Sequence, residues 1–319
     1  MTEYYDPIEY KVTEREDGWP VKNVLQRRLG VSRKLMSRIK LTERGVLLNG
    51  ERVYISVPVR AGDTVSISLE KETSEDILPQ PLPFDIVYED EALLIVNKAA
   101  GVIVHPTHGH YTGTLANGVV DYWQEKGEKF RFRPVHRLDQ ETSGLIAIAK
   151  NAYIHQHISE QLIAGQVIKK YTALIHGCPE PVEGRIDGPI DRDPAEPHRR
   201  IVTESGYPAH TFYKVVECIG AGCRVELQLG TGRTHQIRVH MTSIGHPLMG
   251  DKMYRMPGLE TMDEEKRESL LAWDEAISRQ ALHASELGFI HPLTGERLAF
   301  TAPMPEDMQK LHDKLRKCE

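Results

Sequence analysis

Long hydrophobic runs are missing from this sequence, since no apolar stretch approaches the roughly 20 residues that a membrane span needs. The first residues, MTEYYDPIEYKVTERE, are acidic and polar, so they predict neither a signal peptide nor a transit peptide. Cysteine is scarce: Cys178, Cys218, Cys223 and Cys318 show neither CxxC pairing nor metal-ligand spacing. We therefore expect a reduced cytoplasmic protein with no membrane partner, no disulfide framework and no zinc site.

A strong net charge is also absent, because the formal charge is −6 over 319 residues. Charged residues make up 27% and hydrophobic residues 40%, which is typical of a globular chain long enough for two domains. The charge is unevenly distributed, however. Residues 20–60 contain ten Lys or Arg and two acidic residues, a local charge of +8. Such a patch attracts phosphate whatever the total charge is, although charge alone leaves an ordinary solvated face as an alternative.

Residues 12–72 form the first predicted domain. VKNVLQRRL and SRKLMSRIKLTERG carry apolar residues at helical spacing, and Ser32 can cap the second helix. GVLLNGERVYI, with a turn at Asn49 and Gly50, and RAGDTVSISL read as short strands. Two basic helices followed by a small hairpin unit resemble the S4 RNA-binding domain. The predicted phosphate-contacting residues are Arg27, Arg28, Arg33, Lys34, Arg38 and Lys40.

Residues 73–83 are expected to be an interdomain linker, since the segment is acidic and then rich in proline. We expect it to let the basic module move. Residues 84–319 would form the second domain, with a hairpin at FDIVYEDEALLIVNK and with further strands and helices that do not alternate strictly. This order predicts an α+β fold with a mixed, largely antiparallel sheet and flanking helices.

Three motifs in the second domain carry candidate chemistry. HRLDQETSG contains Asp139, KKYTALIHG contains Tyr171, and LQLGTGRTHQIRVH contains Arg233. Taken singly, each has an ordinary reading as an ion pair, a core tyrosine or a turn. The kinase motif is excluded because Leu138 intervenes and there is no glycine-rich loop or DFG, and the phosphate-binding loop because GTGRT lacks its spacing and lysine. The zinc-protease motif is excluded because His235 and His240 are five apart without its glutamate. HPTHGH, residues 105–110, lies in a predicted loop without a distal ligand set, so no metal is expected.

Together the three motifs resemble the RluA-type pseudouridine synthases. The resemblance covers nearly all of residues 80–300 and includes IVNKAAGVIVHPTHGHYTGTLANGV, HRLDQETSGLIAIAKN and GTGRTHQIRVHMTSIGHPLMGDKMY. Ala99 and Ala100 depart from the proline that many members have before the glycine. The resemblance implies the pseudouridine synthase fold and the isomerisation of uridine in ribosomal or transfer RNA. It implies no cofactor, and we expect a monomer whose partner is RNA.

The resemblance also implies roles for individual residues. Asp139 would be the catalytic carboxylate, and whether it attacks C1′, attacks C6 or removes a C2′ proton stays open. Arg233 would pair with Asp139 and keep it ionised. Tyr171 would stack on the uracil and carry proton traffic. Arg137 would fill the space that the flipped base leaves, His136 would orient the loop, and Leu138 is grouped with them as substrate-binding.

Two alternatives come from other functional classes. A non-catalytic RNA-binding protein could retain the same fold, although binding alone would not need Asp139, Tyr171 and Arg233. A glycoside hydrolase requires two carboxylates at a set separation. Only Asp139 lies in a suitable motif, because Glu141 falls in the turn that follows it.

Overall fold

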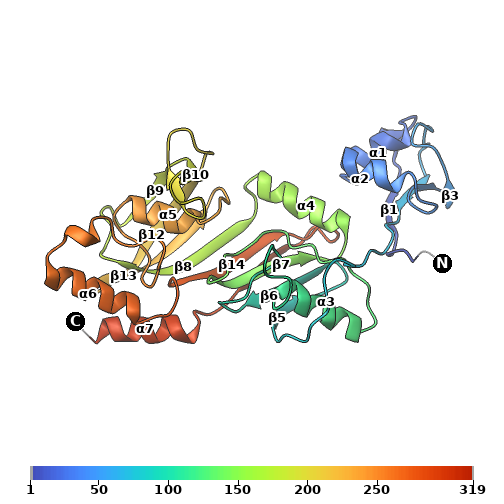
Figure 1. Ribbon diagram of the computed structural model, residues 1–319. Helices are drawn as coiled ribbons and strands as arrows, with labels where there is room; N and C mark the ends of the chain where they lie inside the picture. Colours follow the sequence, from blue (N-terminus) through green and yellow to red (C-terminus); the bar gives the residue numbers. More distant parts are fainter. Residues whose placement is uncertain (1–2, 318–319) are drawn as a thin grey trace.

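The computed structural model describes residues 3–317. Its N-terminal module contains a sheet of order β1-β4-β2-β3 and two short helices (Figure 1). Ser32 caps the second helix by accepting a hydrogen bond from the Leu35 N–H, as expected. Asn49 and Gly50 turn the chain between β2 and β3 with positive φ angles of 52° and 83°. The bounds are β1 Ile8–Lys11, α1 Val21–Arg27, α2 Arg33–Ile39, β2 Leu47–Leu48, β3 Glu51–Arg52 and β4 Thr64–Ile67. The expected start at residue 12 therefore cut off β1, which pairs with β4.

The module is packed against the second domain, at helix α4 (Ala152–Ile163). The Tyr153 hydroxyl donates to the Leu29 carbonyl at 2.8 Å. The Gln156 side chain donates to the Gly30 carbonyl at 2.7 Å and accepts from the Ser32 N–H at 3.0 Å. Buried apolar residues of the module continue into those beneath α4 as one cluster. This contact opposes the expected freedom of the module to move.

The expected linker, residues 73–83, is itself held in place. Ser74 accepts a hydrogen bond from the Phe132 N–H at 2.8 Å, and Ile77 is buried. The Asn117 side chain donates to the Leu78 carbonyl at 2.7 Å, and the Gln80 N–H donates to the Asn117 carbonyl at 3.2 Å. The proline-rich segment is therefore ordered and is not a flexible linker, because its polar groups form hydrogen bonds with the second domain.

The second domain is built on a nine-stranded sheet of order β5-β6-β7-β14-β8-β13-β12-β9, with β15 paired to β14. Among the strands of this sheet in the described part of the chain, only β7 and β14 pair in parallel, so the predicted α+β class with a largely antiparallel sheet is confirmed. The strands are β5 Asp85–Glu89, β6 Leu93–Lys98, β7 Ser143–Ala149, β8 Ile168–His176, β9 Glu183–Asp187, β12 His210–Ile219, β13 Gly222–Leu229, β14 Leu282–Ile290 and β15 Arg297–Thr301. A separate pair, β10 (Ile190–Arg192) and β11 (Arg200–Val202), projects beside α5 (Gln236–Ser243) (Figure 1).

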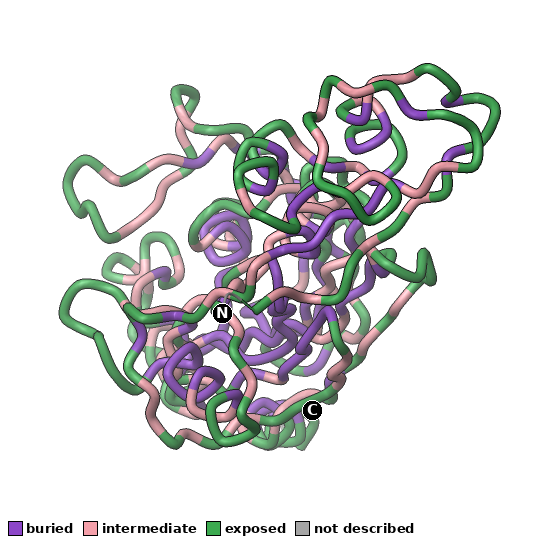
Figure 2. Tube along the Cα trace, turned by 90° about the vertical axis from the view of Figure 1, so that its right-hand side faces the viewer, coloured by how far each residue is buried: buried purple, intermediate pink, exposed green. Residues whose placement is uncertain are grey.

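Alternation along the central strands divides the core between the two sheet faces. In β6, Leu94 and Val96 pack in the cluster that contains α3 (Leu115–Glu125), whereas Leu93 and Ile95 pack in the cluster that contains α4. A third cluster lies under α7 (Glu306–Arg316), near α6 (Glu264–Glu275). Figure 2 shows these buried segments concentrated along the sheet, with exposed loops around them.

The parallel joint between β7 and β14 requires glycine. Gly144 has a φ of +120°, and a Cβ atom there would lie 2.3 Å from the Ala284 carbonyl oxygen. Ala284 is also paired in register with Tyr171 of β8. Since Gly144 follows Asp139 by only five residues, this close approach helps to fix where the Asp139 turn meets Tyr171.

Two cysteines form a disulfide that the sequence did not predict. Cys178, just after β8, is bonded to Cys218 in β12, with their Cα atoms 6.3 Å apart. The expectation of no disulfide was therefore wrong for this pair. Their spacing of 40 residues carries no signal, because only the sheet order brings the two segments together. Cys223 is buried and free, and Cys318 lies outside the described residues.

Candidate active site

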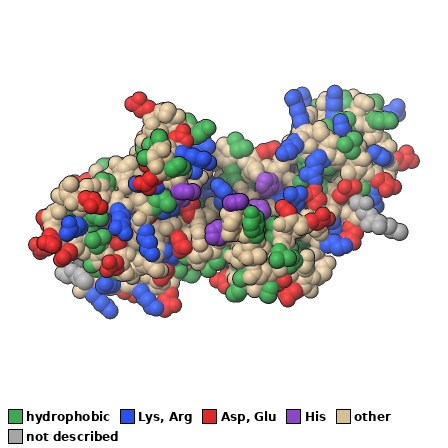
Figure 3. Space-filling view, in the orientation of Figure 1, with side chains coloured by type: hydrophobic (Ala, Val, Ile, Leu, Met, Phe, Trp, Pro, Cys, Tyr) green, Lys and Arg blue, Asp and Glu red, His purple; other side chains and the backbone are tan. Residues whose placement is uncertain are grey.

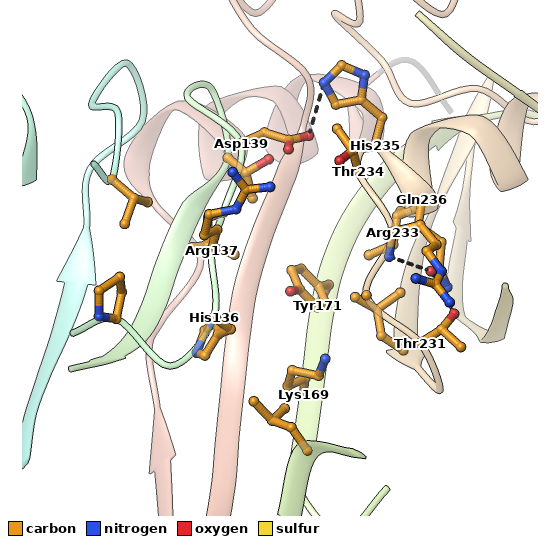
Figure 4. Close-up of a pocket in the computed structure, with 18 of the residues that line it drawn as sticks. His136, Arg137, Asp139, Lys169, Tyr171, Thr231, Arg233, Thr234, His235 and Gln236 are labelled. Carbon is orange, nitrogen blue, oxygen red and sulfur yellow. Dashed lines mark hydrogen bonds and ion pairs between the residues drawn. The ribbon is translucent and has the colours of Figure 1, made fainter. Parts of the chain in front are cut away.

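A cavity of about 830 Å³ collects the three sequence motifs. It is lined by the turn before β7, by β8, by the loop between β13 and α5, and by residues 103–107. Asp139, Tyr171 and Arg233 all line it, as do His136 and Arg137 (Figure 4). Leu138 lines it as well. Figure 3 shows a hollow on this face, with histidine and basic side chains gathered around it.

Asp139 lies in a tight turn whose backbone is held from both sides. The Thr142 N–H donates to the Asp139 carbonyl at 3.1 Å. Lys98, only 1% exposed, donates to the Ala99, Val102 and Gln140 carbonyls at 2.8, 2.8 and 3.0 Å. Burial lowers the pKa of Lys98 to about 7, although the nearby charges of Glu141 and Asp139 oppose this shift. The turn next to Asp139 is thus tied to the loop after β6.

Arg238, not Arg233, is the arginine that contacts Asp139. Its Nη1 donates to Asp139 Oδ2 at 3.3 Å, while Nε and Nη2 donate to the fully buried Asp251 at 2.6 and 2.9 Å. Burial by itself would lower the pKa of the Arg238 guanidinium, but the hydrogen bond and charge of Asp251 and the charge of Asp139 raise it. Arg238 therefore stays cationic, and its Nη1 amino group faces Asp139.

Arg233 lies elsewhere in the cavity, so its predicted pairing with Asp139 was wrong. Its Nε donates to the Pro208 carbonyl at 3.2 Å, and its guanidinium lies 5.4 Å from the centre of the Tyr207 ring. Figure 4 shows it beside Thr231 and Gln236. The chain turns at His235, which has a left-handed φ of 57° and begins α5. Because of this turn, the side chains of Arg233 and Arg238 point to different parts of the cavity. The spacing of residues in the motif does not predict such a turn.

His235 is a second residue at Asp139 that the sequence reasoning missed. Its Nε2 lies 3.9 Å from Asp139 Oδ2 (Figure 4). Its Nδ1 lies 2.8 Å from the Tyr254 hydroxyl, which accepts from the Arg200 N–H at 2.8 Å. The Tyr254 hydroxyl therefore has its proton available for Nδ1, which leaves Nε2–H facing Asp139. Burial lowers the pKa of His235 and favours this neutral form, against the charge of Asp139. A left-handed non-glycine residue was the structural signal, and the sequence does not show it.

Tyr171 and His136 are both neutral groups in this cavity. Burial, followed by the charge of Asp139, raises the pKa of the Tyr171 phenol, so the hydroxyl keeps its proton. Burial and the charge of Lys169 lower the pKa of His136 to about 3. His136 Nε2 accepts from the Ala147 N–H at 3.4 Å, a contact consistent with the expected loop-orienting role. Arg137 is exposed and Leu138 is buried in the core.

The six basic residues predicted to contact phosphate differ in whether an acidic side chain pairs with them. Arg28 pairs with the buried Glu16 at 2.5 Å, and Arg38 pairs with Glu72. Among residues 3–317, no ion pair is found for the other four, and all four are exposed. These four residues are Arg27, Arg33, Lys34 and Lys40. Figure 3 shows basic side chains gathered over the module.

Within the described residues, no group of three or more His, Cys, Asp or Glu side chains is placed to hold a metal ion. His108 of the HPTHGH loop instead contacts the Tyr111 hydroxyl at 3.4 Å. No helix of residues 3–317 is both long and apolar enough to span a bilayer.

The mixed sheet thus carries a cavity lined by histidine and arginine side chains, with Asp139 as its one lining carboxylate among residues 3–317. Residues 92–243 match the family model described as RNA pseudouridylate synthase. The Bacillus subtilis protein "Uncharacterized RNA pseudouridine synthase YjbO" is 40% identical over 284 residues, covering 89% of this chain and 95% of that protein. The Xanthomonas campestris "Ribosomal large subunit pseudouridine synthase D" is 37% identical over 270 residues, covering 85% of this chain and 81% of that protein.

The chain therefore belongs to the RluA-type RNA pseudouridine synthases, isomerases that act on RNA. The fold agrees with this membership. The solved structure "Human RNA Pseudouridylate Synthase Domain Containing 1" superposes with a TM-score of 0.54 and is 25% identical, covering 73% of this chain and 95% of that chain. The comparisons do not favour the alternative of a non-catalytic RNA-binding protein. The expected S4 resemblance of the N-terminal module stays a prediction.

Proposed function

We propose that this enzyme isomerises uridine in structured RNA with Asp139 as the catalytic carboxylate. Asp139 is the one carboxylate among the described residues that line the cavity, and this observation carries the proposal. It also argues against a glycoside hydrolase, which needs a second carboxylate on the other side of the scissile bond.

The reaction breaks the N1–C1′ bond, turns the uracil, joins C5 to C1′ and moves the C5 proton to N1. Asp139 can begin this sequence by attacking C1′ or C6 or by taking the C2′ proton, and each route needs the ionised form. The Arg238 guanidinium lies 3.3 Å from Asp139 Oδ2 as its ion-pair partner. Tyr171, neutral at physiological pH, offers a ring on which the uracil can stack and a hydroxyl that can donate a hydrogen bond.

We infer that the substrate is ribosomal or transfer RNA, and large-subunit ribosomal RNA is the first to test. Relatives of this chain are named as ribosomal large subunit synthases. The unpaired charges of Arg27, Arg33, Lys34 and Lys40 would contact phosphates outside the cavity. Arg137, exposed next to Asp139, would occupy the gap that the flipped base leaves.

The proposal is tested by tritium release from RNA labelled at uridine C5, with the purified wild-type enzyme and the Asp139→Asn variant. We expect release only with wild-type enzyme, while the variant binds the same RNA within a few fold. RNA containing 5-fluorouridine should give a slowly migrating adduct if Asp139 acts as a nucleophile. Near-normal turnover by Asp139→Asn would remove Asp139 from the catalytic role, and wild-type binding without release from any RNA would favour the non-catalytic alternative.

A further inference from the structure

Lys169 is a cavity residue that the mechanism above does not use. It lies on β8 two residues before Tyr171, so both side chains project from the same face of the strand (Figure 4). It lines the cavity, and no hydrogen bond or ion pair to another residue is found for its ammonium within residues 3–317. The next residue, Lys170, faces the opposite side and is paired with Glu286 at 3.1 Å and Glu226 at 3.6 Å.

An ammonium in this position is unfavourable for the free enzyme. Burial lowers the pKa of Lys169, and no opposing charge contributes to the shift. The nearby imidazole of His136 is neutral and offers no counter-charge. Asp139, the only carboxylate of the described residues that lines the cavity, is paired with Arg238. A partly buried cation without a partner is unfavourable, and groups with shifted pKa values of this kind cluster at functional sites.

The space next to the ammonium is open. Lys169 and residues 230–232 line the same cavity. A Cβ atom on Gly232 would lie 3.7 Å from Lys169 Nζ, in van der Waals contact, so the turn lies beside the ammonium and its glycine places no side chain over it. The cavity, about 830 Å³, is large enough to admit more than a single base. Lysine suits a phosphate oxygen as a compact point charge that needs no planar geometry.

We propose that Lys169 binds a phosphodiester oxyanion of the RNA strand beside the target uridine. This subsite rests on the proposed function, since RNA is the polyanion that enters the cavity. Phosphate is the charged group that RNA brings, whereas the uracil carbonyls are neutral and can be satisfied by weaker donors. Binding would neutralise the ammonium and draw the nucleotide backbone down onto β8, next to Tyr171.

The test measures binding in the Asp139→Asn background, so that its readout does not depend on turnover. The probes are a short single-stranded RNA with one uridine and a set of the same RNA with a neutral methylphosphonate at each linkage in turn. Lys169→Gln should weaken binding of the unmodified RNA about tenfold. It should also reduce the log–log salt slope by about 0.7, the value of one phosphate contact on a single strand. Lys169→Arg should restore both, and Lys170→Gln is the control on the same strand.

We expect a Lys169-dependent effect at a single linkage. A methylphosphonate at that linkage should weaken binding to the protein with Lys169, and it should not weaken binding to the Lys169→Gln variant any further. The melting temperature of Lys169→Gln should equal or exceed that of the parent, because the variant removes a partly buried charge that has no acidic partner. Equal effects of every methylphosphonate on both proteins, or an unchanged salt slope, would overturn the phosphate subsite. Failure of the wild-type enzyme to release tritium from C5-labelled RNA would overturn the proposed function instead, and the binding comparison would still decide the role of Lys169.

Discussion

Replacing Arg238 by alanine should damage both the stability and the activity of the enzyme. Arg238 is 8% exposed at its side chain and joins two carboxylates, Asp251 on one side and Asp139 on the other. Arg233 differs, because its guanidinium donates to the Pro208 carbonyl and lies over the Tyr207 ring without a carboxylate partner among the described residues. The two arginines lie on one motif five residues apart, so Arg233→Ala is a matched control.

The stability loss follows from Asp251, which would lose two hydrogen bonds and its cation while fully buried. Removing one partner of a buried ion pair costs about 3–5 kcal/mol. Asp251 also accepts from the Met253 and Tyr254 N–H groups at 3.0 Å each. These remaining donors place the loss at the lower end, about 3 kcal/mol. For a domain of this size, that corresponds to a melting temperature lower by about 6–12 °C.

The activity loss follows from Asp139, which would be left without its cationic neighbour. We expect single-turnover rates at saturating RNA to fall about 100-fold or more. Arg233→Ala should change the free energy of unfolding by less than about 0.5 kcal/mol. Urea unfolding of Arg238→Ala, Asp251→Asn and the double variant should show strong coupling between the two positions.

The reasoning would be refuted by an Arg238→Ala enzyme that melts and turns over like the wild type. It would equally fail if the larger loss of rate and stability appeared in Arg233→Ala. Additive effects of Arg238→Ala and Asp251→Asn would show that the buried pair is not a unit. Arg238→Lys, which keeps the charge without the fork of donors, should fall between wild type and alanine.

Three further outcomes follow from the structure. Tyr254→Phe removes the hydroxyl that holds His235 Nδ1, so kcat should drop several-fold with little change in KM, whereas Tyr213→Phe, whose hydroxyl bonds Pro181 away from the cavity, should leave both unchanged. Burial alone would raise the pKa of Glu89, but hydrogen bonds from Tyr122, Lys150 and Lys126 lower it to about 2. Since this folded-state pKa lies below the unfolded value near 4.5, the stability that Glu89 contributes should be lost as the pH falls from about 4.5 to 2. In urea unfolding at a series of pH values, Glu89→Gln should therefore show a weaker loss of stability over that range. Joint charge reversal of Arg33, Lys34 and Lys40 should weaken RNA binding and its salt dependence while single-turnover rates at saturating RNA stay near wild type, and an unaltered salt slope would identify an ordinary solvated face.

Local chemistry made much of the fold predictable. The apolar segments on either side of the EDE turn predicted the β5–β6 hairpin, and helical spacing with Ser32 as the cap predicted α2. The expectation that motifs around Asp139 and Tyr171 share one site agrees with the cavity that collects them. Strand β14 and its parallel pairing with β7 were not predicted, because that contact depends on Gly144 meeting a strand about 140 residues away.

The remaining errors share a cause, since each depends on a direction or a long-range contact that spacing does not encode. The left-handed turn at His235 decides that Arg238 and not Arg233 reaches Asp139. Sheet order decides that Cys178 meets Cys218. The apolar face of α4 decides that the basic module is docked, so removing the module would expose that face and charge reversal is the cleaner experiment.

The docking of the module on α4 fixes the distance between the basic helices and the cavity. Gln156 alone bonds both the Gly30 carbonyl and the Ser32 N–H, on either side of the turn that joins the two basic helices. The distance from those helices to Asp139 is thereby set by the protein rather than by a flexible chain. On the proposed function, an RNA is selected when its backbone reaches the basic helices while its uridine reaches the cavity. The distance between that backbone segment and the uridine in the folded RNA, and not only the sequence around the uridine, would then decide which positions are modified.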